Sequence, residues 1–194
     1  MMKATALRAK SILTGPQSEW GAIEQEADDP AFVLGVYVAL FAFVPSVFGF
    51  IGACLIGTVT TDGTTARTPL VDGLLGAVFG YVTAGATVLV VALFIYVLTP
   101  VFGGRRGFAA AFKLAVYSFT PLWLAGIFLI LPGLHFLALL SLYGLYLLWL
   151  GLPRLAKVPE EMALSFAIAI AAFAGLLTYV AATAQHTIFG TPGL

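Results

Sequence analysis

The stretch YGLYLLWLGLPRLAKVPEE, residues 143–161, contains the end of one apolar run, a basic turn and the start of the next run. Pro153 supplies no amide hydrogen and disfavours helical geometry in the residue before it, so the first run is expected to end at Leu152. Arg154 and Lys157 then place two positive charges just outside the apolar segment. The pattern predicts a short basic turn between two membrane-spanning helices.

The next helix is expected to start where the same stretch ends. Pro159 suits a first helical position because its missing amide would lack a partner there in any case. Glu160 and Glu161 follow it, where the helix dipole favours negative charge.

The amino-acid composition indicates an integral membrane protein. Apolar residues make up 61% of the 194 positions and charged residues 9%, too few to cover a water-facing surface. Long apolar runs favour spanning helices over a transmembrane barrel, whose strands alternate over about ten residues. Nine basic and nine acidic residues cancel, so no net charge attracts nucleic acid. Cys54 is the only cysteine, which excludes an intrachain disulfide, and it is expected to pack as a small hydrophobe.

The predicted fold class is all-α, a polytopic bundle of five transmembrane helices behind a short amphipathic N-terminal segment. Residues 1–30 form this segment, residues 31–184 the membrane domain, and residues 185–194 a tail on the far side. The expected spans cover residues 31–57, 72–99, 108–131, 134–152 and 162–184.

The N-terminal segment carries signals for a short helix. Thr14 to Gln17 has the spacing of a capping box with a proline near the start. Trp20 and Ile23 share one helical face, so the helix is expected to lie among the lipid headgroups with Trp20 as its anchor. A frayed tail is the alternative. Because no apolar core follows the basic residues until Ala31, the first span is expected to serve as an uncleaved anchor.

Basic residues are distributed unevenly between the two ends of the predicted spans. One end collects eight of them and the other has Arg67 alone, so the N-terminus is expected to be cytoplasmic and the C-terminus outside. The eight are Lys3, Arg8, Lys10, Arg105, Arg106, Lys113, Arg154 and Lys157. Lys113 lies close enough to the inner end to extend its ammonium group to the interface.

Small residues recur every four positions in three spans, a pattern that allows helices to approach closely in lipid. The first series is Gly49, Ala53 and Gly57. The others are Gly76, Gly80 and Ala84, and Ala163, Ala167, Ala171 and Gly175.

Pro121 interrupts the third span and frees the carbonyl of Tyr117, which needs another partner in lipid. Tyr143 and Tyr146 are three residues apart and share a helix face. We expect one of their hydroxyls to bind the Tyr117 carbonyl and to lock the third and fourth spans together. The alternative is that these tyrosines form an aromatic belt at the inner interface.

Several of these stretches together resemble the bacterial branch of the Yip family of five-span membrane proteins, which is named for interaction with Rab-type GTPases. The matching residues run from the amphipathic start to the last span. They are Ile12 to Pro16 with Trp20, Tyr117 to Leu122, Tyr143 to Tyr146, Gly151 to Arg154, and Pro159 with Glu160. The resemblance implies a five-span helical fold in a bacterial inner membrane with a cytoplasmic N-terminus.

Two functions are compatible with these features. The first is a non-enzymatic membrane organiser or trafficking adaptor that binds membrane lipids, a membrane protein or a second copy of itself, as the resemblance implies. Its candidate contacts are Trp20 and a basic rim of Arg105, Arg106, Arg154 and Lys157, for which a purely topological anchoring role is the favoured alternative.

The second is a small transporter, channel or lipid-moving protein with a pathway near Pro121, since broken helices can line transport sites. Against it, Asp72, Lys113 and His135 all lie toward span ends, whereas ion pathways place charges inside.

No catalytic function is expected. The chain has no HExxH, CxxC, G-x-S-x-G or glycine-rich phosphate loop, and no cofactor or metal is expected. His135 and His186 both fall on the expected outer side, where interfacial histidines are ordinary.

Overall fold

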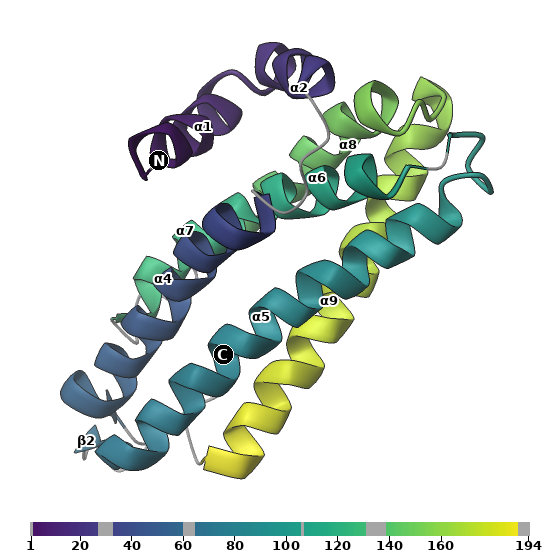
Figure 1. The fold of residues 1–194 in the computed structure, drawn as a ribbon. Coiled ribbons are helices and arrows are strands. Elements are labelled where there is room, and N and C mark those ends of the chain that lie inside the picture. Colours follow the sequence, from purple (N-terminus) through teal and green to yellow (C-terminus); the bar gives the residue numbers. More distant parts are fainter. Residues whose placement is uncertain (1, 27–32, 60–64, 106, 131–138, 190–194) are drawn as a thin grey trace.

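The computed structural model describes residues 2–26, 33–59, 65–105, 107–130 and 139–189. Within these ranges the regular secondary structure is helical apart from one antiparallel pair of two-residue strands, in which Thr58 lies opposite Ala66. Figure 1 shows the long helices side by side, with two short helices folded over one end. The elements in order are α1 Met2–Thr14, α2 Pro16–Gln25, η1 Val33–Val38, α4 Ala39–Phe50, η2 Ile51–Ile56, β1 Thr58–Val59, β2 Thr65–Ala66, α5 Leu70–Leu98, α6 Phe108–Ser118, α7 Thr120–Ala125, η3 Gly126–Ile130, α8 Tyr143–Leu155 and α9 Glu160–Phe189.

Four of these helical segments are long and apolar enough to cross a membrane. They are Gly35–Ile56, Leu70–Leu98, Phe108–Ile130 and Glu160–Phe189. A fifth apolar helix, Leu139–Leu155, is shorter. The predicted fourth span began at residue 134, and residues 131–138 lie outside the described part of the chain. The all-helical membrane fold is confirmed, with a fifth helix that is short in its described part.

The third span forms the centre of the bundle. In its most apolar 18-residue stretch, 67% of the residues are buried inside the protein, against 17–28% in the corresponding stretches of the other three long spans. It packs against α4, α5 and α8, and its small residues allow those helices to approach. Pro121 interrupts it as expected, since α6 ends at Ser118 and α7 begins at Thr120. A Cβ added to Gly144 would lie 2.6 Å from the Ser118 carbonyl oxygen, so α8 packs directly against this interruption.

Two predicted helix ends need correction. The α8 helix includes Pro153 and ends at Leu155, because the proline removes a single hydrogen bond in the last turn of a helix that packing already holds. The expected outer tail is helical as far as it is described, since α9 reaches Phe189 instead of ending near residue 184. Glu160 and Glu161 occupy the first turn of α9, as the sequence predicts.

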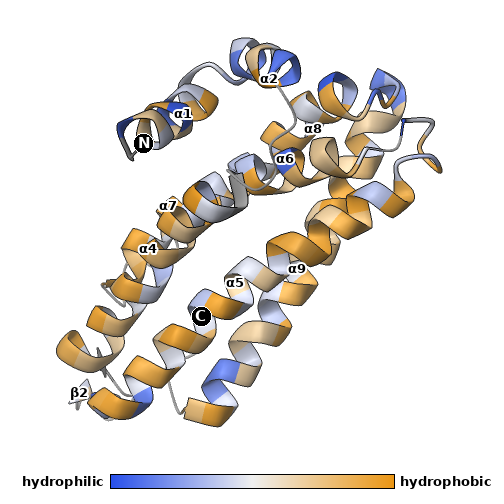
Figure 2. Cartoon of the chain, viewed as in Figure 1, coloured by the Kyte–Doolittle hydropathy of each residue, from blue (hydrophilic) through white to orange (hydrophobic). Residues whose placement is uncertain are grey.

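Polar residues gather at one end of the bundle (Figure 2). We call this the basic end and define it as α1, α2, the loop of residues 99–107 and the turn of residues 156–159. The described basic residues there, or within two turns of it, are Lys3, Arg8, Lys10, Arg105, Lys113, Arg154 and Lys157. Arg67, which follows β2, lies at the opposite end (Figure 1). The structure therefore separates the basic residues as the sequence predicts.

Candidate functional site

The N-terminal segment is a hairpin of two helices, not the single helix expected. The chain turns at Gly15, and Pro16 opens α2 because its fixed φ suits a first helical position. The predicted capping box is wrong, because the Thr14 hydroxyl donates back to the Lys10 carbonyl at 2.9 Å. The inner face of the hairpin is apolar and fully buried at Ile12, Trp20 and Ile23.

Trp20 anchors the hairpin to the bundle. Its indole ring lies in a notch at Gly151, where an added Cβ would stand 2.8 Å from the ring. The ring also meets the edge of Tyr117, with ring centres 6.1 Å apart. Trp20 is therefore enclosed by protein and does not reach lipid headgroups, which corrects its predicted role as an interfacial anchor.

Ion pairs hold the hairpin closed and fix it to the bundle. Arg8 on α1 binds Glu19 on α2 at 2.6 Å and also binds Glu26. Burial works against the charge of Arg8, yet the hydrogen bond and charge of Glu26 together with the charge of Glu19 raise its pKa above the ordinary value. Lys157, in the turn after α8, binds Glu24 on α2. The ion pairs of Arg8 thus join α1 to α2, and the ion pair of Lys157 joins α2 to the bundle.

Two polar side chains of the bundle bind backbone carbonyls of the N-terminal segment. Lys113 is buried, and its Nζ donates to the Glu26 carbonyl at 3.3 Å. The expectation that this ammonium group extends to the membrane surface is therefore wrong. The Tyr143 hydroxyl donates to the Leu13 carbonyl at 3.0 Å.

The predicted tyrosine lock needs the same correction. Tyr143 binds the Leu13 carbonyl of α1 instead of the Tyr117 carbonyl. Tyr146 is partly exposed and packs beside Tyr143 with ring centres 5.3 Å apart. Another polar contact joins the third span to the first span, where the Tyr37 hydroxyl and the Thr120 hydroxyl lie 2.8 Å apart.

The outer surface of the basic end carries exposed basic side chains beside the acidic residues of α2 and of the first turn of α9. Arg105 and Arg154 are exposed there, as expected for the basic rim, whereas Arg106 lies outside the described residues. The α1 helix adds a feature that sequence reasoning missed. Lys3, Leu7 and Lys10 share its outer face, and Leu7 is 63% exposed. The spacing of these three residues could have revealed this face, had a helix been expected before Thr14.

Lys157 holds its ion pair in a strained backbone conformation. Its φ of 54° is left-handed, which costs a residue with a side chain about 1–2 kcal/mol. We expect Lys157→Gly to be more stable than Lys157→Ala by about 1 kcal/mol, because both lose the ammonium group and only glycine relieves the strain. Thermal unfolding in detergent measures the difference. Equal stability of the two variants would contradict the strained conformation.

The Lys157 ion pair also predicts a pH dependence. The hydrogen bond from Lys157 lowers the pKa of Glu24 below its ordinary value, and the charges of Lys157 and Arg154 add to this effect. A lowered folded-state pKa stabilises the fold above the unfolded-state pKa and ceases to do so as pH falls through the folded-state value. The stability advantage of the wild type over Glu24→Gln is expected to be full near neutral pH, to fall as pH drops below the ordinary pKa of a glutamate, about 4.3, and to vanish once pH has passed the lowered folded-state value. An advantage independent of pH would contradict this role of Glu24.

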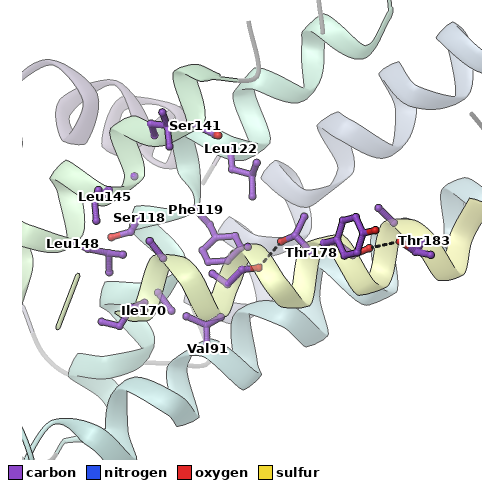
Figure 3. A pocket seen from close by; sticks show the side chains of 18 of the residues that line it. Val91, Ser118, Phe119, Leu122, Ser141, Leu145, Leu148, Ile170, Thr178 and Thr183 are labelled. Carbon is purple, nitrogen blue, oxygen red and sulfur yellow. Dashed lines mark hydrogen bonds between the residues drawn. The ribbon is translucent and has the colours of Figure 1, made fainter. Parts of the chain in front are cut away.

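A second feature lies within the membrane-spanning part. A cavity of about 480 Å³ is bounded by α9 on one side and by the interrupted third span and α8 on the other (Figure 3). Its lining is mostly apolar and includes Ser118, Phe119 and Leu122, which flank or follow the interruption at Pro121. Among the residues that the structure describes, no group of three or more His, Cys, Asp or Glu side chains could hold a metal ion.

The fold and the site together define a helical membrane protein whose N-terminal helices dock on one end of its bundle. A family model described as the Yip1 domain matches residues 10–182, and the chain belongs to this family. The inner membrane protein YohC of Escherichia coli K12 is 30% identical over 159 residues, which cover 80% of this chain and 82% of that protein. The protein of the same name from E. coli O6:H1 gives the same values. No solved structure matches this chain.

Proposed function

We propose that this protein is a non-enzymatic organiser of a bacterial inner membrane, which binds lipid or protein partners at a cytoplasmic basic end. The family and the inner-membrane relative support the location. The observation that carries the proposal is the docked hairpin. Because α1 and α2 bury their apolar face against the bundle, their charged outer face becomes part of one fixed surface with Arg105 and Arg154.

Anionic lipid is the partner chemistry that this surface suits best. Lys3, Lys10, Arg105 and Arg154 are exposed, and each such residue near an anionic leaflet contributes about 1 kcal/mol. Leu7 lies between the two lysines on α1 and offers an apolar contact to the membrane surface.

Retention of anionic lipid tests the proposal. The protein would be extracted in mild detergent, and co-purified phosphatidylglycerol and phosphatidylethanolamine would be quantified by mass spectrometry. The double variant Arg105→Gln, Arg154→Gln is expected to lower the ratio of phosphatidylglycerol to phosphatidylethanolamine several-fold. Arg67→Gln, at the other end of the bundle, is the matched control and should leave the ratio unchanged. An unchanged ratio in the double variant would reduce these arginines to topological anchors and refute lipid binding at this surface.

The orientation has its own test. In a Cys54→Ala background, single cysteines would replace Lys10 on α1 or Thr187 near the end of α9, both of which are exposed. A membrane-impermeant maleimide added to intact spheroplasts should label the cysteine at position 187 and should reach position 10 only after permeabilisation. The reverse pattern would place the basic end outside the cell.

A lipid-moving protein is the second candidate, and one observation favours it. The interruption of the third span lies beside the cavity, and irregular backbone at membrane depth is often found where a helix lines such a space. Flux of a fluorescent lipid across proteoliposomes, absent from empty vesicles and lost on filling the cavity, would support this function over the organiser. Tight vesicles would support the organiser.

A further inference from the structure

The cavity exists because one face of α9 is made of small residues. Ala163 and Ala167 at the start of this face are fully buried in close packing. Ala171 and Gly175 continue the same face but line the cavity, and a Cβ added to Gly175 would meet no atom within 4 Å. The small side chains therefore allow close helix packing in the first half of α9 and leave an open space in the second half.

A buried hydroxyl without a partner belongs to a residue in the wall of this space. Ser118 lines the cavity beside Leu145 and Leu148 (Figure 3), and its side chain is 5% exposed. Its Oγ has no hydrogen-bond partner in the described part of the chain. By contrast, the Thr178 hydroxyl, on the same lining, donates to the Ala174 carbonyl at 2.8 Å. Leaving a hydroxyl without a hydrogen bond in an apolar setting is costly, so a bound group that accepts one from Ser118 would stabilise this wall of the cavity.

The shape of the cavity suits a long chain. Its lining on α9 runs from Ile170 to His186, a distance of about 24 Å at 1.5 Å per helical residue. Most of the surface between these ends is apolar, and the cavity lies along the helix, the direction in which lipid chains run in a bilayer (Figure 3).

The charge of the lining decides which lipids fit. None of the described lining residues is Lys, Arg, Asp or Glu, and the histidine among them, His186, lies at the opposite end of the α9 lining from Ile170. Ser118 lies near the middle of the span Phe108–Ile130, at a depth where a phosphate or carboxylate would need a cation beside it. An ionised headgroup is therefore disfavoured next to Ser118, whereas an uncharged hydroxyl, ester or ketone oxygen can accept its hydrogen bond.

We propose that this cavity binds an uncharged long-chain lipid. The hydrocarbon chain lies along the small-residue face of α9, and a neutral oxygen of the lipid accepts a hydrogen bond from Ser118. This site is separate from the basic end, and the proposal does not depend on the organiser function.

Photoaffinity labelling tests the site. The purified protein would be placed in phosphatidylethanolamine and phosphatidylglycerol vesicles that contain a trace of a long-chain alcohol with a diazirine in its chain. A phosphatidylglycerol carrying the same diazirine chain serves as the charged probe. A plain hydrocarbon carrying the diazirine serves as a third probe, the hydrocarbon probe, which has no oxygen to accept a hydrogen bond. After irradiation, labelled peptides are mapped by mass spectrometry. The alcohol is expected to label the α9 segment of residues 170–186 at least fivefold more than the charged probe does.

Two variants separate the parts of the site, each with a matched control. Gly175→Leu fills the open space and should reduce labelling by the alcohol more than tenfold. Ala172→Leu, on the exposed face of the same helix and outside the cavity, should not. Ser118→Ala should raise the half-saturating concentration of the alcohol about three- to tenfold, the effect of one hydrogen bond, and should leave the hydrocarbon probe unaffected. Thr178→Val is its control, because that hydroxyl is already bonded within α9.

Size-exclusion chromatography and thermal unfolding show which variants are folded. If Gly175→Leu does not fold, Ser118→Ala still decides the test. Equal labelling by the charged probe would mean that an ordinary bilayer chain fills the cavity and would overturn the proposal. So would a lack of labelling in residues 170–186, or unchanged alcohol binding in Ser118→Ala.

Discussion

Replacing Trp20 by alanine is expected to release the N-terminal hairpin from the bundle. The indole ring is fully buried, fills the notch at Gly151 and contacts Tyr117. Loss of a fully buried tryptophan side chain destabilises a packed interface by about 3–5 kcal/mol. The ion pairs of Arg8 and Lys157 are partly exposed and cannot replace this contact. Amide hydrogen exchange in α1 and α2 should therefore accelerate about a hundredfold or more, while exchange in α6 stays slow.

A second tryptophan provides the control for this prediction. Trp149 on α8 is 42% exposed, so Trp149→Ala removes a similar side chain without opening the notch. Its effect on exchange in α1 and α2 should be small. If Trp20→Ala leaves exchange in these helices at the wild-type rate, the hairpin is not held by Trp20. Released helices would also free Lys3 and Lys10 from their fixed place on the bundle, so retention of phosphatidylglycerol should fall in the same variant if the proposed surface acts as a unit.

Four of the five predicted membrane spans are found among the described residues, because length and apolar composition alone determine them. Pro121 gave the position of the helix interruption, since a missing amide has a local consequence. The end of α8 could not be placed in the same way. Pro153 also lacks its amide, but there Leu152 is fully buried, and packing holds the last turn in helical form.

The docking site could not be predicted, because it depends on residues distant in the chain. Trp20 and Ile23 form an apolar helix face that would suit a membrane surface as well as a protein surface. The choice depends on Gly151, whose missing side chain makes room for the indole ring. A glycine inside an otherwise leucine-rich helix was the available signal, since it costs about 1 kcal/mol in helix stability and indicates close packing. The tyrosine lock failed for a related reason, because Tyr143 found a carbonyl on a helix that was not expected.

Gly52→Ala is expected to separate the first span from the end of the third. A Cβ at this position would lie 2.2 Å from the carbonyl oxygen of Leu129, a backbone atom that no side-chain rotation can move away. Alanine favours a helix over glycine by about 1 kcal/mol, but forced overpacking costs about 1–3 kcal/mol or more. The variant should therefore unfold at a lower temperature in detergent than the wild type.

Gly49→Ala is the matched control, three residues earlier on the same segment. Its new methyl group would meet only the Leu129 side chain, at an ordinary distance of 3.8 Å, so the variant should be as stable as the wild type or more stable. The four-residue series Gly49, Ala53 and Gly57 did not identify Gly52. The wide helical turns of Ile51–Ile56 rotate the later residues away from an α-helical register, so α-helical spacing is a poor guide there. Destabilisation by both alanines would mean that the span needs glycine for another reason, whereas opposite effects place the close approach at Gly52.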